Sequence, residues 1–255
     1  MIAASVALAR RALRNALRRP QFLAPLVLFP TLFLAVNVGG LERTTSLQGF
    51  PQVDGFLDFQ LAAAITQSLL LGGVSAGIAA ALDIEGGFFD RLVASPTPRL
   101  AIVLGRVLAA SVIAAIQVVY FLVLGLVFGA SIQGGALGVL SVLAIGIVAG
   151  TGFGALGMMI ALRTRNASTV QGIFPLVFVI LFISSAFFPR ELLSAPADVL
   201  AAYNPLSYIA EGMRQPIAFD NAIGPVLEGL AAAAGVTVVA IGLSVLALRG
   251  RLREA

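Results

Sequence analysis

The chain has 255 residues, of which 59% are hydrophobic and 11% are charged, and its mean hydropathy is +1.02. Soluble domains are about 45–50% apolar, so this composition indicates an integral membrane protein. The sequence contains no Cys, His or Lys. These absences exclude disulfides, thiolate zinc sites, a Walker A loop and lysine Schiff-base chemistry. Its positive charges flank apolar runs instead of covering a soluble face, which argues against binding to nucleic acid.

The N-terminal segment, residues 1–20, carries an amphipathic pattern. Apolar residues recur at helical spacing at Ile2, Val6, Ala9, Leu13 and Leu17. A separate stripe consists of Arg10, Arg14 and Arg18. We expect a helix that lies in the cytoplasmic interface of the membrane. The pattern fits two roles equally well, an anchor that fixes topology or a surface shared with a cytoplasmic partner.

Six apolar segments are long enough to cross a bilayer core, which takes roughly 20 helical residues. They cover residues 22–39, 59–82, 104–128, 136–162, 169–188 and 226–248. Helices satisfy their own backbone hydrogen bonds in lipid, and these segments lack the alternation of barrel strands. We therefore predict an all-α integral membrane protein with six transmembrane helices, forming a single transmembrane domain over residues 1–255.

The arginines are distributed unevenly between the two sides of these six segments. Thirteen of the sixteen fall on one side, and Arg43, Arg190 and Arg214 fall on the other. The positive-inside rule then places both termini and residues 83–99 in the cytoplasm. We expect a multi-pass protein of the cell membrane, with residues 189–225 as an extracytoplasmic loop.

Residues 83–99, DIEGGFFDRLVASPTPR, interrupt the apolar runs with charge. Ile84, Phe88 and Leu92 fall at steps of four with Phe89 and Val93 beside them, and Pro96 and Pro98 follow. The spacing predicts one short cytoplasmic helix with an apolar, aromatic face and a charged rim formed by Asp83, Glu85, Asp90 and Arg91. A protein docking site and an interfacial loop whose phenylalanines enter lipid fit this pattern equally well.

The middle of each predicted span holds no ionised side chain, although ion-driven carriers usually need one as a relay. Energy for active transport must therefore come from outside this chain. The polar residues at depth are Gln67, Ser68, Gln117, Ser141, Thr151, Ser184 and Ser185. Hydrogen bonds between helices explain such residues. Gln117, Ser184 and Ser185 are the candidates for a substrate path, and Gln117 is the strongest because an unpaired buried amide is costly.

Two spans contain residues that affect packing. Gly146, Gly150 and Gly154 in the fourth span recur every four residues, which allows a close helix approach within one subunit or across a dimer seam. Pro175 in the fifth span removes a backbone donor and predicts a bend.

The outer loop contains the segment YNPLSYIAEGMRQP, residues 203–216. Asn204 is suited to cap a helix, Pro205 to its first turn, and Pro216 to its end. We expect a short helix in the outer leaflet, with Glu211 and Arg214 close enough to pair.

Together these features resemble the membrane subunits of ATP-binding cassette (ABC) transporters of the type-2 permease family, which includes daunorubicin-resistance-like drug exporters and polysaccharide exporters. That family has a basic amphipathic N-terminal helix, six spans and a coupling helix between the second and third. The matching residues of the coupling segment are Glu85, Gly87, Asp90, Arg91, Leu92, Ser95, Pro96 and Arg99, followed by Gly105 and Arg106. Residues 204–214 resemble the family's outer Asn-Pro-Leu motif, and Asp90 replaces the usual Glu.

The resemblance implies a permease subunit without enzymatic activity, driven by two copies of a separate ABC ATPase that bind the ATP, so that this chain holds no cofactor. The ATPase would dock on Ile84, Glu85, Phe88, Phe89, Asp90, Arg91 and Leu92, with Arg10 and Arg14. It also implies a second permease subunit, as a homodimer, and a hydrophobic or amphiphilic substrate such as a drug, lipid or glycan-lipid. The competing hypotheses are an ion-coupled carrier, a membrane-embedded enzyme without an ATPase partner, and a non-transporting scaffold.

Overall fold

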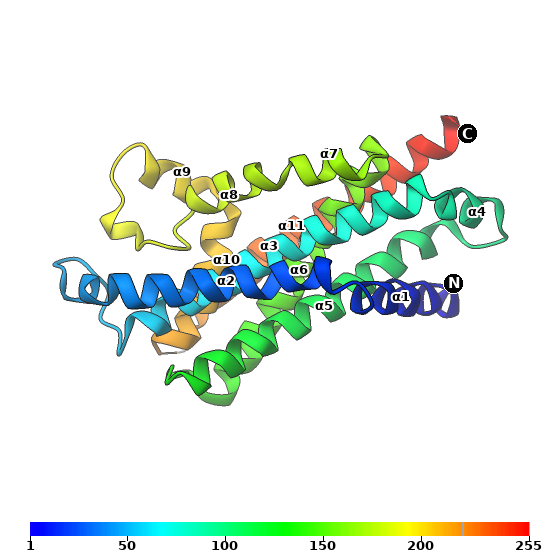
Figure 1. Ribbon diagram of the computed structural model, residues 1–255. Coiled ribbons are helices and arrows are strands. Elements are labelled where there is room, and N and C mark those ends of the chain that lie inside the picture. Colours follow the sequence, from blue (N-terminus) through cyan, green and yellow to red (C-terminus); the bar gives the residue numbers. More distant parts are fainter. Residues whose placement is uncertain (221, 255) are drawn as a thin grey trace.

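The computed structural model describes residues 1–220 and 222–254, and in this part of the chain every regular element is a helix. The elements are α1 (Ile2–Leu17), α2 (Pro20–Leu41), η1 (Glu42–Ser46), α3 (Phe56–Glu85), α4 (Phe88–Ala94), α5 (Arg99–Val127), α6 (Gly135–Thr164), α7 (Ala167–Gly172), α8 (Phe174–Phe182), η2 (Arg190–Leu192), α9 (Ala197–Tyr203), α10 (Pro205–Ala218) and α11 (Ile223–Glu254). The long helices lie side by side in one bundle (Figure 1). Both termini, α1 and α4 lie at one end of this bundle, and α9 lies at the other.

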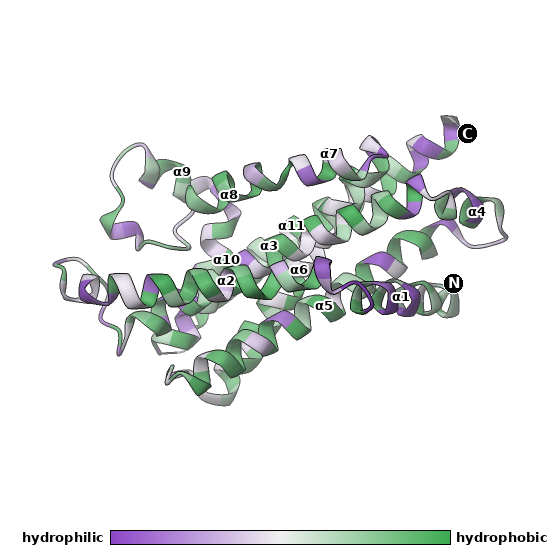
Figure 2. Ribbon diagram, viewed as in Figure 1, coloured by the Kyte–Doolittle hydropathy of each residue, from purple (hydrophilic) through white to green (hydrophobic). Residues whose placement is uncertain are grey.

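Among the residues that the structure describes, five helical segments are long and apolar enough to cross a membrane. They are Pro20–Ser46, Phe56–Glu85, Arg99–Val127, Gly135–Thr164 and Ile223–Arg253. Each segment contains one of the six predicted spans, except that the third ends one residue before its predicted span does, and each begins one to five residues earlier than predicted. Hydrophilic residues gather toward the two ends of the bundle, and apolar residues cover its length (Figure 2). The predicted membrane protein class is therefore confirmed.

The fifth predicted span, residues 169–188, is not a continuous helix. Helix α7 ends at Gly172, α8 runs only from Phe174 to Phe182, and the following residues form turns. Pro175 lies in the first turn of α8, where its missing N–H has no helical partner to lose. The predicted bend is thus a break, and the two pieces together run along the bundle between the α4 end and the α9 end (Figure 1).

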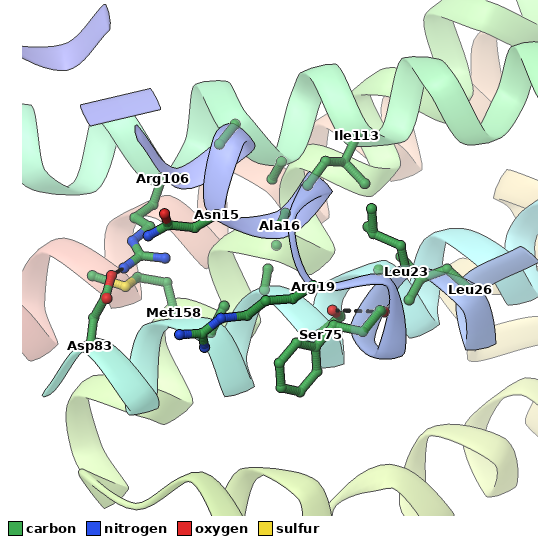
Figure 3. Close-up of a pocket in the computed structure, with 18 residues that line it drawn as sticks. Asn15, Ala16, Arg19, Leu23, Leu26, Ser75, Asp83, Arg106, Ile113 and Met158 are labelled. Carbon is green, nitrogen blue, oxygen red and sulfur yellow. Dashed lines mark hydrogen bonds and ion pairs between the residues drawn. The ribbon is translucent and has the colours of Figure 1, made fainter. Parts of the chain in front are cut away.

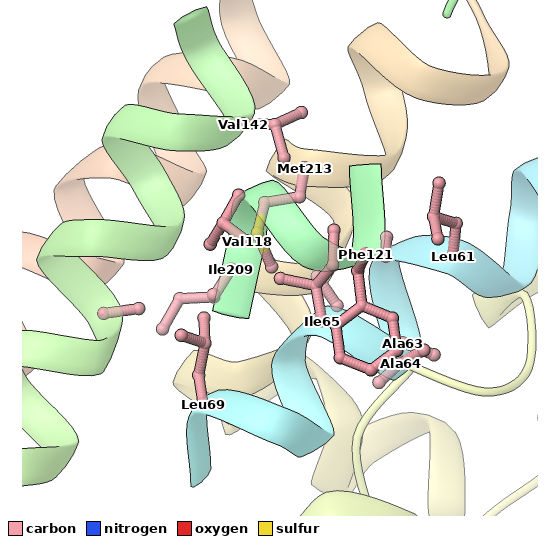
Figure 4. Close-up of a cluster of buried hydrophobic side chains, with 14 of the residues drawn as sticks. Leu61, Ala63, Ala64, Ile65, Leu69, Val118, Phe121, Val142, Ile209 and Met213 are labelled. Atoms are coloured by element: carbon pink, nitrogen blue, oxygen red, sulfur yellow. The ribbon is translucent and has the colours of Figure 1, made fainter. Parts of the chain in front are cut away.

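Helix α3 forms the centre of the bundle. In its most apolar stretch 67% of the residues are buried, whereas in the corresponding stretches of α2 and α11 the buried shares are 17% and 22%. Its side chains Leu61, Ile65 and Leu69 pack with α5, α6 and α10 in the main hydrophobic core (Figure 4). The core includes Phe121 of α5 and Met213 of α10, and both are fully buried. A second apolar cluster fills the α4 end of the bundle.

The glycines of α6 let two neighbouring helices approach closely. A Cβ atom added at Gly146 would lie 2.5 Å from Val118 Cγ2, and one at Gly150 would lie 2.5 Å from Ala114 Cβ. Farther along α6, a Cβ at Gly157 would overlap the backbone of Gly73 in α3. The glycine repeat of the fourth span therefore serves packing within one subunit, as one of the two interpretations predicted.

Helix α1 forms where it was predicted, but its packing face differs from the predicted apolar stripe. Ser5 and Leu8 pack against Gly105 of α5, where an added Cβ would lie 2.7 Å from Leu8 Cβ. Ile2 and Val6 of the predicted stripe are 79% and 54% exposed. The bundle accepts the face with small residues because they allow close helix contact. Of the large apolar residues, Ile2 and Val6 thus remain on the outer face, whereas Leu8 and Leu13 are half-buried.

Candidate functional site

The turn between α3 and α4 divides the predicted coupling helix into two parts. Ile84 and Glu85 form the end of α3, and Phe88 begins α4. Gly87 between them has φ of +67°, a left-handed conformation that glycine adopts without steric cost. The prediction of one helix through Ile84 and Phe88 is therefore wrong, because the Gly86–Gly87 pair turns the chain.

The apolar residues of this segment make contacts within the chain. Phe89 is 4% exposed and packs beside Ile84 in the second apolar cluster. The guanidinium of Arg251 lies over the Phe89 ring at 4.3 Å, and that of Arg11 lies over the Phe88 ring at 3.4 Å. Each phenylalanine thus joins α4 to a helix from one end of the chain. Phe88 is half-buried.

Asp83 joins the end of α3 to two other helices. Its carboxylate accepts hydrogen bonds from Arg11 of α1, with Arg11 Nη1 to Asp83 Oδ2 at 3.0 Å and Arg11 Nη2 to Asp83 Oδ1 at 3.2 Å. Arg106 of α5 donates to the same Oδ2 atom. The sequence interpretation placed Asp83 only on a charged rim. An acid at the end of an apolar run was a signal for such a partner.

Two further acids of the same region bind other helices. The Glu85 Oε1 atom accepts a hydrogen bond of 2.8 Å from the Ala167 backbone N–H, at the start of α7. Asp90 of α4 pairs with Arg251 of α11 at 2.8 Å, although the Asp90 side chain is 67% exposed. The turn between α3 and α4 is therefore connected to α1, α5, α7 and α11.

The remaining charged residues of the predicted docking surface are exposed. Arg10 and Arg14 lie on the outer face of α1. Arg91 of α4 is also exposed and makes no ion pair with the residues that the structure describes. Leu92 is half-buried against the second apolar cluster. Docking of a partner on these residues stays a prediction.

Gln117, the strongest substrate-path candidate, ties three helices together. Its Nε2 atom donates to the backbone oxygen and to the hydroxyl oxygen of Ser68, both at 2.8 Å. The Ser68 hydroxyl in turn donates to the Leu26 carbonyl oxygen at 2.6 Å. Both amide hydrogens of this buried side chain are thus used between α5, α3 and α2. This arrangement matches the packing role that the sequence left open beside the substrate path.

Ser184 and Ser185, the other two path candidates, follow α8 and are buried at the α9 end of the bundle. The Ser184 hydroxyl donates to the Leu181 carbonyl oxygen. The Ser185 hydroxyl donates to the Glu211 carboxylate, and its backbone N–H donates to the Ser207 hydroxyl at 3.1 Å. These contacts fasten the end of α8 to α10.

Arg214 of α10 is a buried charge whose environment the sequence did not predict. It is 4% exposed, and its guanidinium donates to the carbonyl oxygens of Phe59 at 3.1 Å, Ser185 at 3.3 Å, and Ala186. It also lies over the Phe59 ring at 3.8 Å. Burial lowers the pKa of Arg214 to about 10, so the group remains charged at neutral pH.

Helix α10 packs inside the bundle against α3, α6 and α11, and its position in the outer leaflet stays a prediction. Asn204 caps it as predicted, with its Oδ1 atom accepting from the Leu206 N–H at 3.0 Å. The helix continues through Pro216 to Ala218, so the predicted end was two residues short. Glu211 pairs with Arg190 at 3.4 Å, and Arg214 binds carbonyl oxygens, which corrects the expected pairing of Glu211 with Arg214.

In the described part of the chain, two cavities lie beside α7 and α8, although Val170 of α7 and Leu181 of α8 are buried against the bundle. One of about 680 Å³ lies toward α2 and α3, and its lining includes Gln21, Phe22, Ser75, Gln171 and Phe174. The other, of about 320 Å³, lies toward α6, α10 and α11, and its lining is almost entirely apolar, including Phe153, Leu156, Val177, Ile180 and Leu206. Space on both sides of this segment suits a path for an apolar molecule.

A bundle of apolar helices of this length, with an N-terminal helix and a charged helical turn at one end, defines a multi-pass membrane protein. The sequence model of the family described as "ABC-2 type transporter" matches residues 4–217. The chain belongs to this family of transporter permeases, whose members normally work with an ABC ATPase.

Relatives named as transport permeases agree with this assignment. The chain is 26% identical over 203 residues to the daunorubicin resistance ABC transporter permease protein DrrB1 of Streptomyces coeruleorubidus, covering 77% of this chain and 68% of the relative. It is 26% identical over 213 residues to the putative transport permease ycf38 of Porphyra purpurea, covering 82% and 72%. The ycf38 protein of Pyropia yezoensis is 26% identical over 210 residues, with the same coverage.

Proposed function

We propose that this protein is the membrane-spanning subunit of an ABC exporter and that a separate ATPase subunit drives it. Two ATPase copies would act on a homodimer of this chain, whose isologous contacts would follow a two-fold axis. Membership of the ABC-2 family supports the permease role. The chain's own contribution is the path and the connection to the ATPase, and ATP would be bound by the partner.

The turn between α3 and α4 is the observation that carries this proposal. Its exposed residues, Glu85, Asp90 and Arg91, are available to a partner at the end of the bundle where both termini lie. Its acids are bonded to α1, α5, α7 and α11. A partner that moves this turn would therefore move four helices at once, which is the mechanical role of a coupling element.

The substrate path is proposed along α7 and α8, which would form the sixth crossing. The two flanking cavities leave room for this segment to move, and their lining favours a hydrophobic or amphiphilic substrate, such as a drug, a lipid or a glycan-lipid. Gln117, Ser184 and Ser185 use their polar groups within the chain in this conformation. They would contact substrate only after the helices separate.

The proposed orientation places both termini in the cytoplasm of a cell membrane protein. The arginine distribution supports it, since the end of the bundle with both termini also holds Arg91, Arg106 and Arg251. Arg43 lies in η1, at the opposite end. Arg10 and Arg14 on the outer face of α1 would then lie at the cytoplasmic surface, within reach of an ATPase or of lipid headgroups.

Co-purification with the ATPase subunit tests the docking site. Arg91→Glu reverses an exposed charge that has no internal partner in the described chain, so the fold should persist while ATPase binding falls about tenfold or more. The matched control is Arg43→Glu, the same change at an exposed position on the opposite end of the bundle. Equal ATPase binding by the wild type and Arg91→Glu would contradict docking on α4.

A further inference from the structure

A narrow cavity at the α4 end of the bundle has one polar and one apolar end (Figure 3). It lies between α1, α2, α3, α5 and α6. Asn15, Arg19, Asp83 and Arg106 form the polar end. The apolar lining includes Phe22, Leu23, Leu26 and Ile113. None of these residues belongs to the proposed ATPase surface or to the cavities beside α7 and α8, apart from Phe22 and Leu26 of the shared helix α2.

The polar end carries an excess of positive charge. Arg11 and Arg106 both bind the single carboxylate of Asp83, and the same Oδ2 atom accepts from both. The side chains of Arg106 and Asp83 are only 20% and 18% exposed. One carboxylate neutralises one of the two guanidinium groups, and a partly buried cation without a full counter-charge is unfavourable.

Arg19 adds a third guanidinium group to this region. Its side chain extends from the start of α2 toward the polar end of the cavity (Figure 3). It forms no hydrogen bond or ion pair with the part of the chain that the structure describes. The donors of Arg106 other than Nη2 likewise have no partner among the described residues. Charged donors without an acceptor in the described chain therefore face this small space, from the mostly buried Arg106 and from Arg19, which is also exposed to solvent.

The size and the walls of the cavity determine which acceptor fits. Its volume is about 70 Å³, which is room for one tetrahedral oxyanion and too little for a whole lipid. The walls beside the polar end are mostly apolar, and charge-assisted hydrogen bonds are stronger where the surroundings are less polar. Helix α2 is mostly exposed on its other sides, so the chains of an amphiphile would remain in the bilayer while its headgroup enters.

We propose that this cavity binds the phosphate of an anionic phospholipid from the cytoplasmic leaflet. Arg19 and Arg106 donate to the phosphate oxygens, and the bound charge balances the excess at Asp83. The lipid then joins the junction of α1 and α2 to α5, beside the turn between α3 and α4. The proposal rests on the orientation proposed above and is independent of the ATPase partner and of the transported substrate.

Lipid binding to the full chain tests this proposal. The protein is placed in nanodiscs of phosphatidylcholine, with or without phosphatidylglycerol, and its thermal unfolding midpoint is measured. We expect phosphatidylglycerol to raise the midpoint by about 3 °C or more. Arg19→Gln should lower the affinity for phosphatidylglycerol about tenfold, because it removes a charged donor but no internal contact.

Arg18→Gln is the matched control, since Arg18 is adjacent and exposed but does not line the cavity. It should leave the affinity within about twofold of the wild type. Inorganic phosphate added to phosphatidylcholine nanodiscs identifies the source of the anion. A stabilisation by free phosphate that Arg19→Gln removes supports the anion site with a soluble ligand. No Arg19-dependent response to either anion, or equal losses in both variants, would overturn the proposal.

Discussion

Helix α6 and the α7–α8 segment follow each other in the chain, yet the bundle holds them in opposite ways. Helix α6 packs along its length, with Gly146 and Gly150 against α5 and Gly157 against α3. The α7–α8 segment has a cavity on each side, and Leu176 and Val179 of α8 are 55% and 51% exposed. Dense packing holds two neighbouring helices in one arrangement. Cavities beside a helix leave other positions of that helix accessible.

The α7–α8 segment is nevertheless fastened at both ends. At the start of α7, the backbone N–H of Ala167 donates to Glu85, at the end of α3, at 2.8 Å. At the end of α8, Asn204 donates to the Ile180 carbonyl oxygen at 2.8 Å, and Arg214 binds the carbonyl oxygens that follow. A segment with fixed ends and cavities beside its middle is suited to move in the proposed transport cycle when the turn between α3 and α4 moves, while α6 stays in place.

Removing the contacts of Arg214 at the end of α8 gives the largest expected change in stability. Arg214→Gln should lower the free energy of unfolding by about 3 kcal/mol, because three buried carbonyl groups lose a charged donor. Denaturant titration in mixed micelles measures this loss. Arg43→Gln, at an exposed position, should change stability little. A small loss for Arg214→Gln would show that the end of α8 is not held there.

Disturbing the close packing of α6 against α3 gives the next largest change in the free energy of unfolding. Gly157→Ala should cost about 2 kcal/mol, because the added Cβ overlaps the carbonyl oxygen of Gly73 and the helices must separate. Gly242→Ala is the matched control, since a Cβ there meets no atom within 4 Å, and helix propensity makes that change neutral or slightly favourable. The same unfolding titration compares them. Equal stabilities would refute the close contact of α6 and α3.

A smaller effect, of opposite sign, comes from the centre of α3. Gln67 is 1% exposed, and its Oε1 and Nε2 atoms have no hydrogen-bond partner in the described chain. Gln67→Leu should therefore raise the free energy of unfolding by about 1 kcal/mol. Gln117→Leu should lower it by a similar amount, since that amide bonds Ser68. Destabilisation by both would show that Gln67 has a polar role in the scaffold.

The sequence predicted most of the fold because periodicity and length determine which segments span a bilayer. All five long helices lie where apolar runs predicted them. Asn204 and Pro205 correctly marked the start of α10, since a capping side chain and a fixed φ act locally. The predicted class and family followed from these local signals and from the coupling-segment motif.

Features that depend on tertiary contacts were predicted less well. Periodicity could not tell that Pro175 breaks a helix when Pro25 and Pro30 lie within α2, because neighbouring groups decide the outcome. The bundle, and not the hydrophobic stripe, selected the face of α1 that carries Ser5 and Leu8. The contact between Arg214 and Phe59 could not be predicted either, because the two residues are 155 positions apart in the sequence.

Transport by the reconstituted protein, with and without the ATPase subunit, tests the central claim most directly. Daunorubicin, the drug in the name of one relative, is a suitable first probe. We expect proteoliposomes to accumulate an amphiphilic substrate against its gradient only when the ATPase and ATP are both present. Uphill transport by this chain alone, driven by an ion gradient, would contradict the account.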